Sequence, residues 1–168
     1  MATQDESTQN ERFEDTGESI HWFTDETLAV CPQCAGCAVS RRMEKTEHPD
    51  WFAPRRVTCR SCSFAKAWAG RQIWRGVRRV QDDYFGLSLW LQTPCCGDLL
   101  WAYSEQHLSL LEDFVRARLR ERASHERSGW SNTSVISRLP AWIKAAKHRD
   151  EVLKGLSRLR VRLAEADR

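Results

Sequence analysis

The sequence predicts an α+β fold in which short antiparallel strands and a second β-hairpin precede about three α-helices. Two Cys-x-x-Cys pairs in the first half lie between segments that are typical of short strands. Residues 85–92 alternate apolar and polar side chains with the period of a strand. After Ser104 the apolar residues recur at helical spacing. With 41% hydrophobic residues in 168, the chain has enough apolar material for a modest core.

The two cysteine pairs are the strongest motif. Cys31-Pro-Gln-Cys34 and Cys59-Arg-Ser-Cys62 are separated by 24 residues. Four thiolates in two such pairs are the usual ligands of a closed tetrahedral zinc site, because each short spacing lets a tight turn aim two sulfurs at one ion. A disulfide or free thiols are the alternatives, and the odd count of seven cysteines argues against a complete disulfide set. We therefore expect Cys31, Cys34, Cys59 and Cys62 to hold one structural Zn²⁺.

Two such knuckles at the tips of β-hairpins form a zinc ribbon, which we place at residues 20–70. Gly36 is expected to take a positive φ in the first knuckle. Strands are expected at Ala38–Arg41 and at Ser63–Trp68. The remaining predicted parts are an acidic disordered leader at residues 1–19, a basic connector with a hairpin and an amphipathic helix at residues 71–123, and a loop with basic helices at residues 124–168.

The second half is expected to contain the hairpin and the helices. Residues 85–92 and 99–103 are the predicted strands, with residues 93–98 as the turn. Ser104 is the predicted N-cap of a helix that continues to Arg122. Pro140 is expected to open a short helix, and Asp150 to cap the last one. The expected buried stripes are Leu108, Leu111, Val115 and Leu119, and then Val152, Leu156, Leu159 and Leu163.

The most informative charge pattern lies between Trp51 and Gln81, where eight basic residues occur without one acid. Arginine neutralises phosphates and stacks on bases, and tryptophan offers a stacking surface. A basic face for an acidic protein, or for the chain's own leader, would show the same pattern, and each tryptophan is also a core candidate. The expected nucleic-acid contacts, called the basic strip below, are Arg55, Arg56, Arg60, Lys66, Arg71, Arg75, Arg78, Arg79, Trp51, Trp68 and Trp74.

The net charge of +3 conceals an asymmetry. Residues 1–27 carry eight acids against Arg12, so residues 28–168 carry +10. The acidic segment is typical of a solvated leader, and the alternative is that it folds back onto the basic surface. From Arg138 onward nine bases outnumber four acids, which predicts a second basic surface. Its bases at four-residue spacing are Lys154, Arg158 and Arg162.

Three cysteines remain outside the main set. Cys37 follows Cys34 by three residues, and Cys95 and Cys96 lie in the expected hairpin turn. Adjacent cysteines rarely ligate one ion together, so we favour roles as small buried residues or as a substitute ligand in the main site. A second site made from Cys37, one of the adjacent cysteines and a histidine is the less favoured alternative.

Residues 31–70 resemble the zinc ribbons of transcription factors, topoisomerase tails and many small bacterial proteins, through the four cysteines of the two pairs. The longer order continues with Leu89-Trp90-Leu91, Cys96-Gly97, Leu100–Tyr103, a helix and Arg138–Lys144. It is similar to small bacterial zinc-ribbon proteins that lack an assigned activity. The resemblance implies a metal-stabilised module that works with a polyanion or a partner, and it supplies no catalytic residues.

We expect a non-catalytic nucleic-acid-binding module, for DNA or RNA, whose affinity is dominated by charge. The alternative is a protein-interaction adaptor subunit of a larger bacterial complex. The sequence lacks a nucleophile–base pair, a phosphate loop and an open metal-ligand set, so neither an enzyme nor a small-molecule substrate is expected. No apolar run approaches the roughly 18 residues of a membrane span and no signal peptide is recognisable, so the expected location is the cytoplasm, away from membranes.

Overall fold

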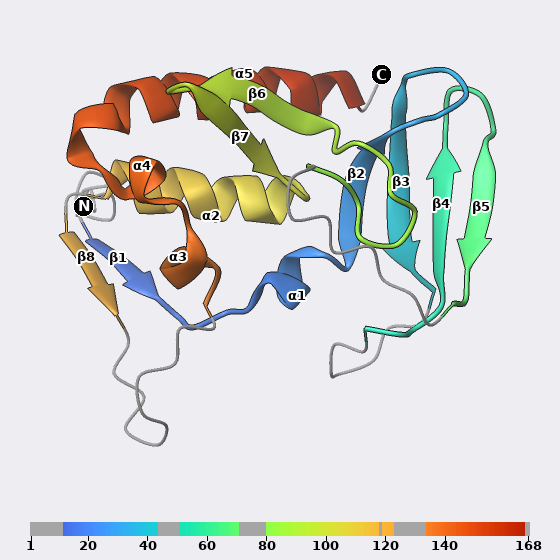
Figure 1. Cartoon of the computed structure of the whole chain (residues 1–168), viewed down its shortest axis with the longest axis horizontal. Coiled ribbons are helices and arrows are strands. Elements are labelled where there is room, and N and C mark those ends of the chain that lie inside the picture. The colour runs from blue at the N-terminus through green and yellow to red at the C-terminus, as the bar shows by residue number, and fades with distance from the viewer. Residues whose placement is uncertain (1–11, 44–50, 71–79, 118, 123–133, 167–168) are drawn as a thin grey trace, which may run out of the picture.

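The computed structural model of the chain describes residues 12–43, 51–70, 80–117, 119–122 and 134–166, the segment 119–122 by its backbone alone. The fold is α+β, as the sequence predicts. In Figure 1 a four-stranded antiparallel sheet lies at one side of the molecule, and two long helices with a second hairpin lie at the other. The sheet has the order β2-β3-β4-β5, and its strands are β2 Glu26–Val30, β3 Cys37–Arg42, β4 Arg55–Cys59 and β5 Ala65–Trp68.

The sheet follows the period-two burial that the sequence suggests. In β4, Arg55, Val57 and Cys59 are buried while the residues between them are exposed. The buried face packs against residues 80–89, where Tyr84 meets Trp68 edge to face at 4.9 Å between ring centroids. The outer edge of β2 is also covered, because Leu89 forms a bridge with Ala29. The strand expected at Ala38–Arg41 is therefore confirmed, and the one expected at Ser63–Trp68 is confirmed from Ala65 onward.

The second hairpin is confirmed, but its strands are shifted along the chain. β6 spans Leu91–Cys95 and β7 spans Asp98–Ala102, so Thr93 and Pro94 belong to a strand and not to the turn. Pro94 lies opposite Leu99, next to the pair that closes the turn. Alternate pairs of an antiparallel ladder exchange no hydrogen bonds, so a proline is tolerated there. Residues 85–90, the first part of the expected strand 85–92, contribute only isolated bridges.

The helices are α1 Ile20–Phe23, α2 Glu105–Arg116, α3 Val135–Arg138, α4 Ala141–Lys144 and α5 Arg149–Ala166, with the 3₁₀ turn η1 Ala146–His148 before α5. Ser104 is the N-cap of α2, as predicted, because its Oγ accepts a hydrogen bond from the backbone N–H of His107. Pro140 precedes α4 as its N-cap residue, and Asp150 lies within the first turn of α5.

The prediction that the α2 helix continues to Arg122 is wrong. The helix ends at Arg116, and Leu119–Arg122 forms β8, which pairs in parallel with β1 at Arg12–Asp15. The backbone turns at Ala117, whose ψ of 133° is extended. Strand pairing with a distant segment thus overrides a local helical pattern.

The same pairing corrects the extent of the expected disordered leader. Residues 12–15 form β1, and Phe13 packs edge to face on Phe114 of α2 at 5.5 Å between ring centroids. The ladder with β8 and the Phe13 ring together attach this polar segment to the core. Residues 1–11 lie outside the described residues.

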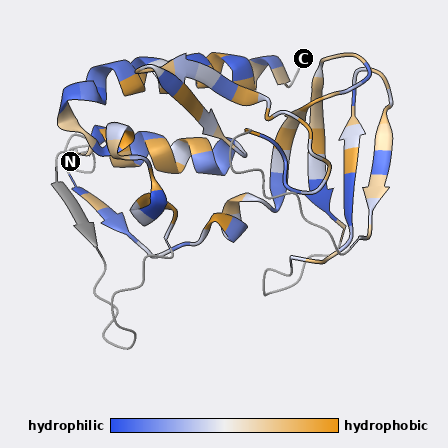
Figure 2. Cartoon of the chain, viewed as in Figure 1, coloured by the Kyte–Doolittle hydropathy of each residue, from blue (hydrophilic) through white to orange (hydrophobic). Residues whose placement is uncertain are grey.

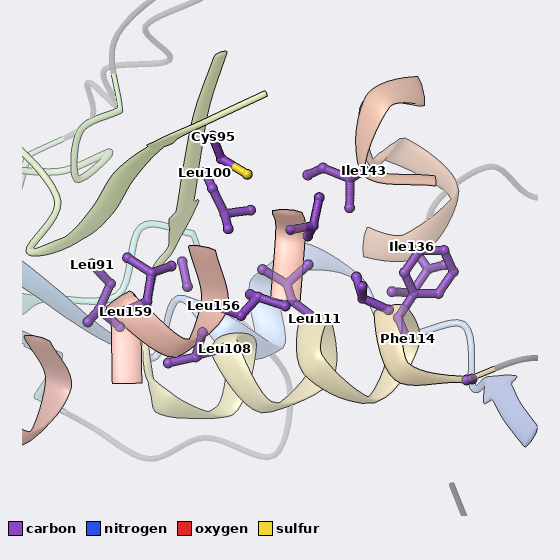
Figure 3. Packing of buried hydrophobic residues seen from close by; sticks show 14 of the residues in the cluster. Leu91, Cys95, Leu100, Leu108, Leu111, Phe114, Ile136, Ile143, Leu156 and Leu159 are labelled. Carbon is purple, nitrogen blue, oxygen red and sulfur yellow. The ribbon is translucent and has the colours of Figure 1, made fainter. Parts of the chain in front are cut away.

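The main core lies between the second hairpin, α2 and α5. Figure 3 shows Leu91, Cys95 and Leu100 of the hairpin together with residues of both helices. Figure 2 shows hydrophobic and hydrophilic residues alternating along α2 and α5, as expected for helices with one buried stripe. The predicted stripes are confirmed for all residues except Leu119, which lies in β8, and Leu163, which is only half-buried.

Two of the bases that the sequence assigns to a second basic surface also bind the hairpin. Arg158 donates to Thr93 Oγ1 at 3.1 Å and to the Pro94 carbonyl at 2.8 Å. Arg162 donates to the Trp90 carbonyl and stacks over the indole of Trp90 at 4.3 Å. These two arginines therefore attach α5 to the hairpin, while Arg158 and Lys154 both remain exposed.

Gly155 gives a test of this helix–hairpin contact. A Cβ at this position would lie 2.8 Å from Leu100 Cδ2 and 3.3 Å from Cys95 Sγ. Gly→Ala inside a helix ordinarily stabilises by about 1 kcal/mol. We expect Gly155→Ala to destabilise instead by about 1–3 kcal/mol, because the core side chains must shift. Urea unfolding measures this change. Ser157→Ala, at an exposed position of the same helix, is the control, and equal stability of the two variants would contradict the packing.

His107 gives a second test, because it is buried among aromatic rings. Its Nδ1 accepts the Tyr103 N–H at 3.2 Å, and burial lowers the pKa of the imidazole to about 4. The ordinary value is 6.5, so the unfolded chain binds a proton that the folded chain does not. Stability is therefore complete above pH 6.5 and is lost as the pH falls toward 4, by about 3 kcal/mol.

Urea unfolding of the wild type and of His107→Gln between pH 7.5 and 4 checks this expectation. The difference in unfolding free energy between the two proteins should change with pH only in the window from about 6.5 to 4. A difference that stays constant across this window would contradict the buried neutral imidazole. Comparison with the variant removes the contribution of other groups that titrate in acid.

Candidate metal centre and basic edge

The sequence-predicted cysteines meet at one point. The sulfurs of Cys31, Cys34, Cys59 and Cys62 all lie within 4.8 Å of one another. Cys31 Sγ is 3.5 Å from Cys62 Sγ, and Cys34 Sγ is 3.6 Å from Cys59 Sγ. The two pairs come from the turn between β2 and β3 and from the turn between β4 and β5. The chain therefore has a candidate metal site at the tips of two hairpins.

The two knuckles repeat the same backbone hydrogen bonds. The N–H of Cys31 donates to the Gly36 carbonyl, and the N–H of Cys59 donates to the Phe64 carbonyl, both at 2.8 Å. In the first knuckle the N–H of Gln33 donates to Cys31 Sγ, and that of Gly36 donates to Cys34 Sγ, both at 3.4 Å. Such N–H donors stabilise sulfur in its charged form and fix its direction.

The expectation that Gly36 takes a positive φ is wrong. Ala35 has a φ of 59°, and Ser63 occupies the same place in the second knuckle with a φ of 60°. Each residue directly follows the second cysteine of its pair and turns the chain so that the next N–H faces a sulfur. Gly36 is needed for space instead, because a Cβ there would lie 3.3 Å from both Cys34 Sγ and Ser61 Oγ.

The thiols of the cluster shift one another's pKa values. Burial acts to raise the pKa of Cys59, but the N–H groups of Cys62 and Ser61 and the thiols of Cys34 and Cys31 lower it to about 7. For Cys62, the Phe64 N–H lowers the pKa, yet burial and the three neighbouring thiols raise it to about 12. Four thiolates cannot share this volume without a cation to offset their repulsion.

The donor set fits a tetrahedral zinc ion. Zinc–sulfur bonds of about 2.3 Å at tetrahedral angles separate two sulfurs by about 3.8 Å. The separations of 3.5 and 3.6 Å are close to this value. An ion at this centre would be held by the four cysteines alone, which leaves no open position and is typical of structural sites.

The basic strip is only partly a surface. Arg56 on β4, Arg60 in the second knuckle and Lys66 on β5 are exposed, as predicted. Arg71, Arg75, Arg78, Arg79 and Trp74 lie outside the described residues. Arg56 pairs with Ala67 and Lys66 pairs with Val57, so the side chains of Arg56 and Lys66 emerge from opposite faces of the sheet. These bases therefore do not share one flat face of the sheet.

Arg55 is a correction to the predicted strip, because only 2% of its surface is exposed. Its Nη1 donates to the Thr24 carbonyl at 2.6 Å, and its guanidinium lies 3.9 Å from the ring centroid of Tyr84. Asp82, buried nearby, offsets the charge, although burial raises the pKa of that carboxyl. Arg55 alternates with the exposed Arg56 along β4, so strand pleating sends one arginine inward and its neighbour outward.

The two described tryptophans of the strip are half-buried. Trp68 packs on Tyr84, and Trp51 packs edge to face on His21. Each ring therefore already has an aromatic neighbour, which supports the core role more than a stacking platform.

The spare cysteines show what sequence reasoning missed. Cys95 and Cys96 lie with Glu151 in a second group of possible metal ligands, all within 4.8 Å of one another. Neither Cys37 nor a histidine belongs to this group. The first turn of α5 supplies the carboxylate, 55 residues from Cys96. No local pattern in the sequence connects these positions.

Comparisons with protein-family models, with curated proteins and with solved structures find no match to this chain. In the described part of the chain, no helix combines the length and the apolar character that crossing a membrane requires. The arrangement of the chain's own side chains is therefore the basis for any functional argument.

Removal of the metal tests the candidate centre. The buried residues of this end of the sheet are Cys31, Ala38, Val57 and Cys59, a core too small to hold four strands. Binding free energies at such sites are about 10 kcal/mol or more and act as folding free energy. We expect chelation, or Cys34→Ser, to unfold the β2–β5 sheet while α2 and α5 remain protected from amide hydrogen exchange.

Cys37→Ser is the matched control, because Cys37 begins β3 but lies outside the four-sulfur cluster. It should retain protection across the whole sheet. Protection of β3 and β4 that survives complete chelation would show that the sheet does not depend on an ion.

Proposed function

We propose that the chain is a non-catalytic nucleic-acid-binding module of the zinc-ribbon type, held by one structural zinc ion at Cys31, Cys34, Cys59 and Cys62. Binding is dominated by phosphate contacts along the basic strip. The observation that carries the proposal is the difference between paired and unpaired cations in the sheet.

The arginines of β3 are paired. Arg41 contacts Glu26 at 2.7 Å, and Arg42 contacts Asp25 at 2.5 Å. In contrast, Arg56, Arg60 and Lys66 are exposed and make no ion pair with any residue that the structure describes. The sequence has no acid between Trp51 and Gln81. Unpaired cations on one edge of a small protein attract a polyanion and favour its association.

The position of these cations supports the same proposal. Of the described strands, β5 pairs only with β4, so it forms an open edge of the sheet, whereas β2 is covered by residues 88–90. Lysine on an open edge also prevents edge-to-edge aggregation, which explains Lys66 by itself. It does not explain Arg56 on the sheet face or Arg60 beside the metal ligands. The four arginines from Arg71 to Arg79 extend the same run of charge in the sequence.

The test is a titration of zinc-loaded protein with labelled single- and double-stranded DNA and RNA at several salt concentrations. We expect Arg56→Ala/Lys66→Ala to weaken binding about tenfold for all sequences. The slope of log K against log salt should become less steep by about one to two. Each phosphate contact that is lost no longer releases counterions when the protein binds. Arg78→Ala/Arg79→Ala should have the same kind of effect.

The matched control is Arg116→Ala/Lys154→Ala, which removes the same charge from exposed positions on α2 and α5. It should leave the salt slope unchanged. If this control weakens binding as much as the strip variants, net charge and not the strip governs binding. Absence of binding at low salt would end the proposal.

A protein-interaction adaptor is the second candidate. Three large apolar side chains, Trp22, Met43 and Phe52, are more than half exposed. Exposed aromatic and methionine side chains are typical of contact sites between proteins. Capture of a partner that survives nuclease treatment, and that is lost in Trp22→Ala/Phe52→Ala, would favour this function.

A further inference from the structure

We propose that Cys95, Cys96 and Glu151 form a second metal site, which binds a thiophilic divalent cation such as Zn²⁺ or Cd²⁺ and leaves one coordination position open. The three ligand atoms lie within 4.8 Å of one another. The site is formed by the tip of the β6–β7 hairpin and the first turn of α5. In Figure 1 this tip lies at the opposite end of the molecule from the knuckles, so the two sites are independent.

The distance between the two sulfurs suits two ligands of one metal ion. Cys95 Sγ and Cys96 Sγ are 3.6 Å apart, which equals the Cys34–Cys59 separation in the first cluster. The N–H of Cys96 donates to Glu151 Oε1 at 3.2 Å and so orients the carboxylate beside the two sulfurs. An ionised carboxylate has capacity for further contacts after accepting this bond. Two sulfurs and an oxygen at these separations suit zinc or cadmium better than a hard cation.

The backbone of Cys96 removes the usual objection to adjacent cysteine ligands. Neighbouring side chains of an extended strand point to opposite faces, which separates their sulfurs. Cys96 has a φ of 53° and Gly97 a φ of 78°, as the two central residues of a tight hairpin turn. This turn type favours Asn, Asp or Gly at its first central position. A cysteine there is strained, and this conformation places both sulfurs on one side.

Neighbouring contacts hold the hairpin tip on α5. Gly155, one turn after Glu151, leaves room for Cys95 Sγ and Leu100. Arg158, one turn further, binds Thr93 and the Pro94 carbonyl. The helix therefore presents the carboxylate, then a space for the sulfur, then an anchor for the strand. Such supporting contacts fix metal ligands before the ion arrives.

The experiment counts zinc ions bound to the full chain, by native mass spectrometry and by competition with an indicator chelator. A phosphine reductant is present so that no Cys95–Cys96 disulfide forms. We expect two ions per wild-type chain and one per chain in Cys96→Gly. Glycine relieves the positive φ, so this variant folds, which near-ultraviolet circular dichroism of the tryptophans verifies. Cys96→Ser should also bind one ion.

Two further variants identify the site. Glu151→Gln keeps the shape of the side chain and should weaken the second ion about 10- to 100-fold. Cys37→Ser should still bind two ions. Cobalt gives an independent readout, because the second equivalent should produce a weaker sulfur-to-metal absorption band than the first, in proportion to its smaller number of thiolates. One ion per wild-type chain at saturating zinc, or two ions in Cys96→Gly, would overturn the proposal.

Discussion

The meeting of four sulfurs is the constraint on which the sheet depends. Each pair closes a different hairpin, and the short contacts from Cys31 to Cys62 and from Cys34 to Cys59 both cross from one hairpin to the other. Two of the four buried residues at this end are themselves ligands. A candidate metal centre therefore stands here in place of a conventional apolar core, which is the usual solution when a small module cannot bury enough surface.

The other half of the molecule is held by a larger core and by arginines that bind internal acceptors. Arg160 contacts Glu112 and Glu105 of α2, and Arg158 and Arg162 bind the hairpin. Basic residues of the C-terminal helix thus satisfy carbonyls and carboxylates within the fold. Those of the outer sheet edge have no such partners among the described residues. Arg56, Arg60 and Lys66 are thus exposed bases that serve no internal acceptor in the described part of the chain.

The features that sequence reasoning predicted correctly are those set by local chemistry. The cysteine spacing, the strands beside it and the Ser104 cap each depend on residues within a few positions of one another. The features that it missed depend on distant contacts. The β1–β8 pairing joins segments more than 100 residues apart, and Glu151 approaches Cys96 from another element. Arg55 is buried because its guanidinium binds the Thr24 carbonyl and lies over the Tyr84 ring. The charge pattern of a strand gives the number of bases, but it does not show which of them point to the buried face and which to the exposed face.

The distribution of backbone strain links the two cysteine groups. Among the described residues outside glycine, a positive φ occurs at Ala35, Ser63 and Cys96. The first two follow the second cysteine of a knuckle, and each one turns the next N–H toward a sulfur. The third is a cysteine that turns its own sulfur toward that of Cys95. Left-handed backbone is costly for such residues and persists where the surroundings require it. In the knuckles the positive φ serves to orient the four sulfurs. At the hairpin tip the turn alone would favour glycine or asparagine, so a cysteine at this position supports the proposed second site by the same reasoning.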